Sequence, residues 1–186
     1  MPMDTSSLSI PNLLHIAPNE YVGGFVSPES LSELAALGFT HIIDMLPEHE
    51  HGGFDEAAMA AELGLYYAHL PIVGGHDLNR SNAEALDALL ASVGETPVLV
   101  HCMSGNRVGA LFALRAAWLK GMSHEQALLE GRRYGLTKLE PLVVQLLQQG
   151  QAYVCVMDTA SWSARCHASA LSPIDFGHSV PSLYRQ

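Results

Sequence analysis

The chain has 186 residues, of which 48% are apolar and 15% charged, and its formal net charge at pH 7 is −10. This length and composition predict one globular domain with a sizeable core and exclude a disordered chain. Nucleic acids and anionic membrane surfaces are held by clustered lysine and arginine, so the acidic balance argues against both as partners.

Cysteine usage and the N-terminal sequence favour a cytoplasmic location. The three cysteines, Cys102, Cys155 and Cys166, are odd in number and lack metal-site spacing, which suits a reducing compartment better than a disulfide framework. The chain start lacks the basic region and apolar core of a secretory signal, so no targeting segment is predicted. The most apolar helix is far shorter than the ~20 residues that cross a bilayer.

Residues typical of helix starts, helix ends and irregular segments divide the N-terminal half into alternating strands and helices. Prolines within residues 1–17 predict an irregular arm. Ser27 and Pro28 are typical of a helix start, and Gly38 of a helix end. The expected elements are a strand at 21–26, a helix at 28–37, a strand at 41–46, a helix at 55–63 and a strand at 65–72.

Several polar residues of this half are candidate site residues with simpler explanations. Asp44 is predicted to accept local backbone hydrogen bonds at the end of its strand rather than to act as an acid or base. The segment Glu48-His-Glu-His51 alternates potential metal ligands, but such a loop needs a third partner on a fixed element, and none is apparent. We therefore predict a solvated loop and no metal site. His69 is predicted to be a core or edge histidine.

The loop at 73–79 contains a candidate general acid. Its paired glycines allow the backbone to close over a ligand. Asp77 is the candidate for protonating a leaving oxygen, with His76 second. Asp77 is equally suited to cap a helix that begins near Ser81, and the sequence does not decide between these two interpretations.

The C-terminal half continues the alternation and predicts an α/β fold with a mostly parallel sheet. Ser123 and Gln126 fit a capping box at the start of a helix. In such folds the site lies at the carboxyl ends of the strands. The expected elements are a helix at 81–93, a strand at 98–100, a helix at 108–120, a helix to Arg133 and a helix at 140–149.

The most informative stretch runs from Pro97 to Gly109, where a buried strand passes through a short loop into a helix. Cys102 falls at the helix start, where free backbone N–H groups favour an anion. His101 and Arg107 also stabilise a thiolate, so Cys102 is predicted to be a nucleophile. The loop residues Met103, Ser104, Gly105 and Asn106, with the Arg107 guanidinium, would form a cup for a tetrahedral oxyanion.

The pattern His101-Cys102-x-x-Gly105-x-Arg107 resembles the signature loop of cysteine-dependent phosphatases of the dual-specificity type. It is most similar to a bacterial family, the phosphatase-like domain of beta-lactamase-hydrolase-like proteins, which is also described as a sulfur transferase. The resemblance covers residues from about 18 to 149. Further segments that carry it are Tyr21-Val-Gly-Gly, Ser27-Pro-Glu, Leu37-Gly-Phe-Thr-His-Ile-Ile-Asp44, Leu70-Pro-Ile-Val-Gly-Gly75 and Gly135-Leu-Thr-Lys-Leu-Glu-Pro141.

The resemblance implies a single three-layer domain, with a four- to five-stranded sheet flanked by helices, over residues 18–150. It also implies that the loop containing Asp77 carries the general acid. Two departures concern the chemistry. Four residues separate Cys102 from Arg107, whereas tyrosine phosphatases generally have five and rhodaneses four. Val108 stands where these phosphatases usually carry a Ser or Thr that stabilises the departing thiolate, and only Ser104 is a possible substitute.

Three functions remain open at this point. The first is a phosphomonoester hydrolase with Cys102 as nucleophile, Arg107 as oxyanion holder and Asp77 as acid. The second is a sulfurtransferase that carries a persulfide on Cys102. The third is a catalytically poor oxyanion-binding module. The expected partner is a phosphorylated or sulfur-donating small molecule or protein, and no cofactor is predicted.

Residues 151–186 lie outside the resemblance and are predicted to be a loosely ordered extension. Residues 153–157 are typical of an edge strand or a packed tail. Cys155 or Cys166 is also a candidate for resolving an oxidised Cys102 by disulfide formation.

Overall fold

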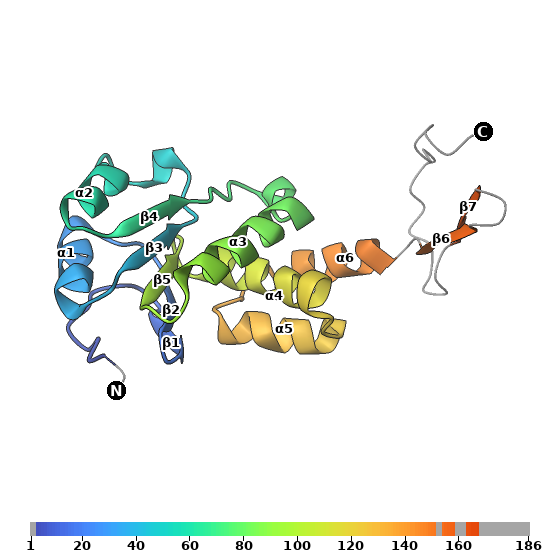
Figure 1. The fold of residues 1–186 in the computed structure, drawn as a ribbon, viewed down its shortest axis with the longest axis horizontal. Coiled ribbons are helices and arrows are strands. Elements are labelled where there is room, and N and C mark those ends of the chain that lie inside the picture. Colours follow the sequence, from blue (N-terminus) through green and yellow to red (C-terminus); the bar gives the residue numbers. More distant parts are fainter. Residues whose placement is uncertain (1–2, 152–153, 159–162, 168–186) are drawn as a thin grey trace. The chain divides into compact units, whose positions relative to one another are not determined.

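The strand that precedes Cys102 lies in the middle of a five-stranded sheet. In the computed structural model, which describes residues 3–151, 154–158 and 163–167, every residue of this strand is buried. The strand order is β1-β2-β5-β3-β4, and Figure 1 shows the sheet with its helices. The strands are β1 (Leu14–Ala17), β2 (Glu20–Gly23), β3 (His41–Asp44), β4 (Tyr66–His69) and β5 (Val98–His101).

The sheet register brings four strand ends into one row. Strands β2, β5, β3 and β4 are parallel, and their pairing sets Gly23 beside His101, His101 beside Asp44, and Asp44 beside His69. Paired residues on neighbouring parallel strands point to the same face of the sheet. The carboxyl edge therefore presents a row of polar side chains from three strands, next to the loop that contains Cys102.

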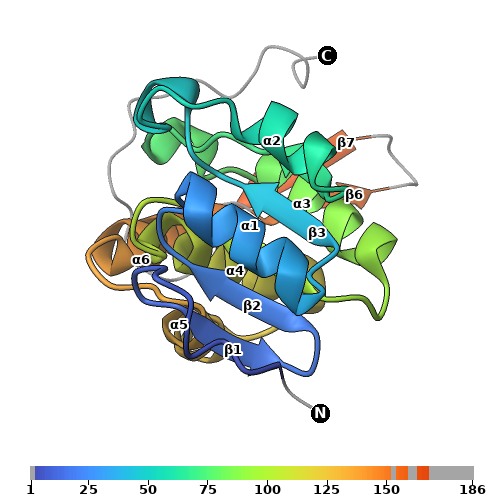
Figure 2. The ribbon, with the colours of Figure 1, turned by 90° about the vertical axis from the view of Figure 1, so that its left-hand side faces the viewer.

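Helices cover both faces of the sheet, as expected for parallel strands. Figure 2 shows α1 in front of the sheet and α3 and α4 behind it. One buried cluster joins Leu31 and Leu34 of α1 and Ala60 of α2 to Tyr21, Ile42 and Leu99 of the sheet. The helices are α1 (Pro28–Leu37), α2 (Glu56–Glu62), α3 (Arg80–Val93), α4 (Asn106–Lys120), α5 (His124–Arg133) and α6 (Glu140–Gln151).

Local sequence signals explain several of these boundaries. The Ser27 hydroxyl accepts the N–H of Ser30 at 3.1 Å, and Gly38 ends α1 with a φ of +97°, which glycine adopts at no steric cost. Ser123 and Gln126 form the predicted capping box of α5. The α/β class and the mostly parallel sheet are confirmed.

The predicted irregular arm contains one regular element. Strand β1 lies within residues 1–17 and pairs antiparallel with β2. The prolines at 11 and 18 flank this short strand without entering it. As an edge strand, β1 depends on its pairing with β2 more than on any local preference.

The chain divides into two units, Met1–Val143 and Val144–Gln186. In the second, β6 (Val154–Asp158) pairs antiparallel with β7 (Ser163–His167) in a separate two-stranded sheet, with Cys155 opposite Cys166. A strand near 153–157 was among the alternatives and is observed, whereas β7 lies where a loosely ordered chain was expected. The rest of that extension, 168–186, lies outside the described residues.

Among the described residues, no helix combines the length and apolar character that crossing a lipid bilayer requires.

Candidate active site

Cys102 directly follows β5 and lies at the base of the loop that leads into α4. Its backbone N–H donates to the Gly23 carbonyl at 3.2 Å, and its side chain is buried, with 1% of the residue exposed. The N–H of Gly105 donates to its Sγ at 3.2 Å. Gly105 has a φ of +85°, and this left-handed conformation, which glycine adopts readily, turns the loop back over the sulfur.

Neighbouring segments hold the loop in place from outside. The Met103 carbonyl accepts the N–H of Phe25 at 3.0 Å, and the Ser104 carbonyl accepts the side-chain amide of Asn12 at 3.0 Å. The Asn106 Oδ1 accepts backbone N–H groups of the segment before α6. These bonds engage loop carbonyls and one side chain. As at any helix start, the N–H groups in the first turn of α4 have no carbonyl partner within their own helix.

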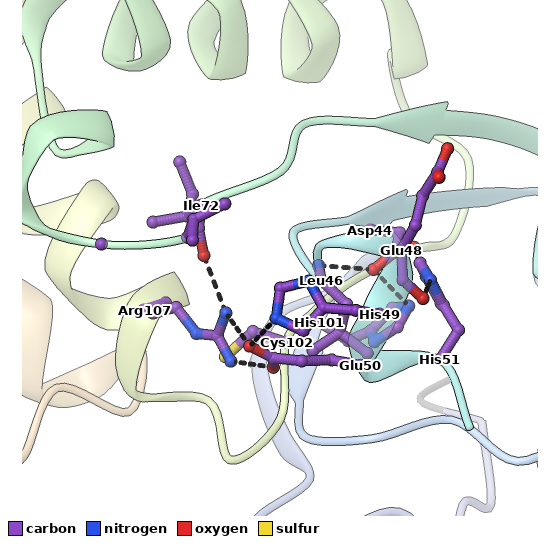
Figure 3. A network of polar contacts seen from close by, with 12 residues as sticks. Asp44, Leu46, Glu48, His49, Glu50, His51, Ile72, His101, Cys102 and Arg107 are labelled. Atoms are coloured by element: carbon purple, nitrogen blue, oxygen red, sulfur yellow. Dashed lines mark hydrogen bonds and ion pairs between the residues drawn. The ribbon is translucent and has the colours of Figure 1, made fainter. Parts of the chain in front are cut away.

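Arg107 is paired with an acidic residue from a distant part of the chain. Its Nη2 lies 2.5 Å from Oε2 of Glu50 and its Nη1 lies 3.3 Å from Oε1, so the pair is bidentate. Nη1 also donates to the Ile72 carbonyl at 2.7 Å. Figure 3 shows the guanidinium held between these partners beside Cys102. Glu50 is not among the predicted site residues, because the 48–51 pattern indicates a solvated loop.

The loop borders a cleft whose facing wall is mostly apolar. A cavity of about 380 Å³ is lined on one side by Met103, Ser104, Asn106 and Arg107. The facing wall is formed by Ile72, Val73, Leu78 and Leu139 together with Gly74 and Gly75. Four of the five residues predicted to bind an oxyanion thus line this cleft, whereas Gly105, which contacts the sulfur, and Cys102 itself are not among the lining residues.

Asp77 lies in the segment beside the cleft, but its carboxylate is bound to its own turn. Oδ2 accepts the N–H of Val73 at 2.8 Å and that of Gly74 at 3.3 Å. Neither Asp77 nor His76 is among the cleft-lining residues. The capping alternative is wrong for the helix, because Asn79 caps α3 by accepting the N–H of Asn82. A role for Asp77 as general acid stays a prediction.

His101 is fully buried and is held by acidic residues. Its Nε2 lies 2.8 Å from Oε1 of Glu56 and 3.5 Å from Oδ1 of Asp44. Burial opposes a charged ring, but the hydrogen bond to Glu56 and the charges of Glu56 and Asp44 outweigh it and raise the pKa of His101 above its ordinary value. The predicted role of His101 in stabilising a thiolate at Cys102 stays a prediction.

Asp44 contacts His101 and also His51 and Tyr67, two residues that the sequence pattern did not connect to it. Its Oδ1 accepts the N–H of Leu46 at 2.7 Å, as predicted, while Oδ2 accepts the hydroxyl of Tyr67 and contacts Nε2 of His51, each at 2.5 Å. His51 is 7% exposed, so the expectation of a solvated loop is wrong at this residue. The register of β3 with β4 and with β5, together with the packing of α2, brings these groups together.

Comparisons with known proteins agree with this geometry. A family model described as "Beta-lactamase hydrolase-like protein, phosphatase-like domain" matches residues 12–118. Beta-lactamase hydrolase-like proteins of two Xylella fastidiosa strains are 28% identical to the chain over 118 residues, or 61% of this chain. The match covers 27% of each relative, so the chain spans about a quarter of their length.

Solved structures share the fold at low sequence identity. A candidate phosphatase from Shewanella putrefaciens CN-32 has a TM-score of 0.59 at 19% identity, covering 83% of this chain and 92% of that one. Tk-PTP in its active form has a TM-score of 0.57 at 21% identity, covering 75% and 97%. P. aeruginosa TpbA, as a serine-for-cysteine variant in complex with pTyr, has a TM-score of 0.54 at 20% identity, covering 80% and 87%.

These structures establish a phosphatase-type fold. The family model spans more than half of the chain and includes the loop with Cys102 and Arg107. The chain therefore belongs to the family of the phosphatase-like domain of beta-lactamase hydrolase-like proteins.

Proposed function

We propose that this protein is a cysteine-dependent phosphomonoester hydrolase with Cys102 as its nucleophile. The observation that carries the proposal is the 3.2 Å hydrogen bond from the Gly105 N–H to Sγ of Cys102. A backbone N–H directed at sulfur, close to a helix N-terminus, stabilises the thiolate that attacks phosphorus. Membership of a family named for its phosphatase-like domain supports the same chemistry.

Arg107 retains donors for a bound phosphoryl group. An arginine has five N–H donors, and the hydrogen bonds to Glu50 and Ile72 use three of them. The Nε–H and one Nη2–H remain, and they add to the backbone N–H groups at the start of α4. Such preorganised donors stabilise the charge that develops on the equatorial oxygens of the transition state.

The reaction then proceeds in two displacements. Sγ of Cys102 forms a bond to phosphorus as the bond to the ester oxygen breaks, and the leaving oxygen takes a proton. Water next attacks the phosphocysteine, the S–P bond breaks, and the thiolate is regenerated with release of inorganic phosphate. Asp77 is our candidate for donating the first proton and accepting one from water. For this its carboxylate has to leave the Val73 and Gly74 amides and turn into the cleft.

A second candidate function rests on the length of the loop. Four residues separate Cys102 from Arg107, and the resulting smaller cup suits a single transferable sulfur. In this alternative Cys102 takes the outer sulfur of a donor such as thiosulfate, and Arg107 holds the sulfite that leaves. The persulfide then passes its sulfur to a thiol or cyanide.

One assay separates the two functions. Purified protein is given an aryl phosphate in one reaction and thiosulfate with cyanide in another, each beside Cys102→Ser. We expect release of inorganic phosphate that the substitution abolishes, and little thiocyanate. Thiocyanate production as the main Cys102-dependent activity would replace the hydrolase with the sulfurtransferase. If the protein is inactive in both assays but still binds phosphate, it acts as the oxyanion-binding module instead.

A further inference from the structure

A second cavity lies on the side of the sheet edge where α2 packs, and its residues take no part in the proposed reaction. This cavity of about 480 Å³ is lined by His51, Glu56, Tyr67 and His69, among others. Asp44, which is fully buried, contacts His51 and Tyr67 at its wall. Three secondary-structure elements and the 48–51 turn therefore contribute polar groups to one place.

The donor atoms of these residues are close enough to share one ion. One nitrogen or oxygen atom each of Asp44, His51 and His69 lie within 4.8 Å of one another. Oε2 of Glu56 lies 3.8 Å from Nε2 of His51. The two imidazoles and the Asp44 carboxylate form a donor set typical of zinc and related divalent transition metals.

Both histidines have one ring nitrogen fixed by a backbone carbonyl. Nδ1 of His51 faces the Glu48 carbonyl at 3.2 Å, and Nε2 of His69 faces the Leu46 carbonyl at 2.6 Å. A carbonyl only accepts, so each of these nitrogens carries the ring proton. The other nitrogen of each ring is the one that a metal ion would bind. Metal-binding histidines are oriented in this way, by a hydrogen bond from the nitrogen that does not touch the metal.

The relative position of the two rings is also compatible with a common ligand. Their centroids are 5.8 Å apart and their planes are tilted by 57°. Two imidazoles bound to one tetrahedral ion at about 2.0–2.1 Å would have ring centres about 5 Å apart. A small shift of the exposed His69 ring is enough to reach this spacing.

One buried carboxylate oxygen beside the cavity has no hydrogen-bond partner among the described residues. Glu56 is 2% exposed, and its Oε2 is buried without a hydrogen-bond partner. Among the described side chains, the ion pairs of Asp44 and Glu56 are formed with histidines alone. Nε2 of His51 lies 2.5 Å from Oδ2 of Asp44, so a bound ion would take the place of the proton between these two atoms.

We propose that the cavity beside α2 binds one divalent transition-metal ion of the zinc type, with Asp44, His51 and His69 as its protein ligands. The ion adds positive charge beside the buried carboxylates of Asp44 and Glu56. Tyr67 and the backbone N–H of Leu46 orient Asp44 by hydrogen bonds. His51 follows Glu50 in the chain, so the ion fixes the turn whose carboxylate pairs with Arg107.

The test is titration of the chelator-treated full chain with Zn²⁺ by calorimetry and by thermal unfolding. The measurements compare wild type with His51→Asn, His69→Asn and Cys102→Ser. We expect one high-affinity ion per wild-type chain, with a rise in Tm because the ion binds only the folded state. Each histidine substitution should weaken that binding by about 100-fold or more. Cys102→Ser should bind as wild type does.

His49→Asn is the matched control, because His49 lies on the same turn with 71% of its side chain exposed, and it should leave affinity unchanged. His69 is exposed, so its substitution tests the ligand set even if His51→Asn fails to fold. Co²⁺ should give visible d–d bands without a sulfur-to-metal charge-transfer band. Failure of wild type to bind Zn²⁺, undiminished binding by His69→Asn, or a charge-transfer band lost in Cys102→Ser would each overturn the proposal.

Discussion

At the scale of single residues, the pairing of Glu50 with Arg107 determines how the guanidinium is presented to the cleft. The two side chains are 24% and 17% exposed, so solvent screens their attraction less than at an open surface. A bidentate pair also fixes the plane of the guanidinium. We therefore regard Glu50 as a positioning residue that acts through Arg107.

Glu50→Gln is expected to lower kcat/KM for an aryl phosphate by roughly 10- to 100-fold, because a misplaced guanidinium stabilises the transition state poorly. Steady-state kinetics with the folded variant measure this loss. Glu48→Gln is the matched control, since Glu48 is an exposed acid on the same turn. Higher activity in Glu50→Gln would show instead that the carboxylate competes with the substrate for Arg107.

At the scale of elements, the loop after β5 depends on a close approach of the segment that follows β2. A Cβ added to Gly24 would lie 2.6 Å from the Met103 carbonyl oxygen and 2.9 Å from that of Pro11. Both contacts are with backbone, which cannot rotate away as a side chain can. Gly24 thus allows the chain after β2 to pack directly against the loop around Cys102.

Gly24→Ala is predicted to destabilise the protein by about 1–3 kcal/mol through overpacking, and to lower activity by displacing Met103. Denaturant unfolding and the aryl phosphate assay measure the two effects. Gly23→Ala is the comparison, because the nearest atom to its added Cβ, at 2.9 Å, belongs to the side chain of Ile10. Equal stability of Gly24→Ala and wild type would contradict the role given to this contact.

Helices α3 and α4 are joined by a charge cluster that should respond to acid. Asp87 lies 2.7 Å from the Lys120 ammonium and 2.8 Å from Arg115. The hydrogen bond to Lys120 is the largest cause of the lowered pKa of Asp87; burial, the next in size, opposes it, and the hydrogen bond to Arg115 lowers the pKa further. Because the pKa of Asp87 is lower in the folded protein than in the unfolded chain, its charge stabilises the fold at pH values above the unfolded-state pKa of about 3.9. This stabilisation is lost as the pH falls through the folded-state pKa.

Asp87→Asn should therefore cost at most about 1 kcal/mol at pH 7, because the pair is partly exposed. The difference from wild type should vanish at a pH below the folded pKa of Asp87. Denaturant unfolding across this pH range provides the measurement. A difference that persists undiminished in acid would mean that Asp87 acts through packing rather than charge.

At the scale of the whole molecule, local signals predicted most elements but not the contacts between them. The buried run Val98–Val100 and the helix boundaries at Ser27 and Gly38 were sufficient to predict strand β5 and helix α1. Strand β1 was missed because it depends on pairing with β2. The cysteine loop was predictable because His101, Cys102 and Arg107 are neighbours in the chain.

The rest of the candidate site depends on contacts between distant segments. Glu50 and Arg107 are 57 positions apart, and Glu56 and His101 are 45 apart. No spacing rule connects such residues. The 48–51 pattern did show potential ligands, but their fixed partners, Asp44 and His69, become neighbours only through the register of β3 and β4.

The central claim is that Cys102 forms a covalent phosphoryl intermediate. Val108, fully buried, has no hydroxyl to assist departure of the thiolate, so hydrolysis of the intermediate should be slower than its formation. Rapid-quench kinetics with an aryl phosphate should then show a burst close to one equivalent of phenol per active chain. Acid-trapped protein should carry the phosphoryl group on the peptide that contains Cys102. Turnover without a label on Cys102, or undiminished turnover by Cys102→Ser, would contradict the account.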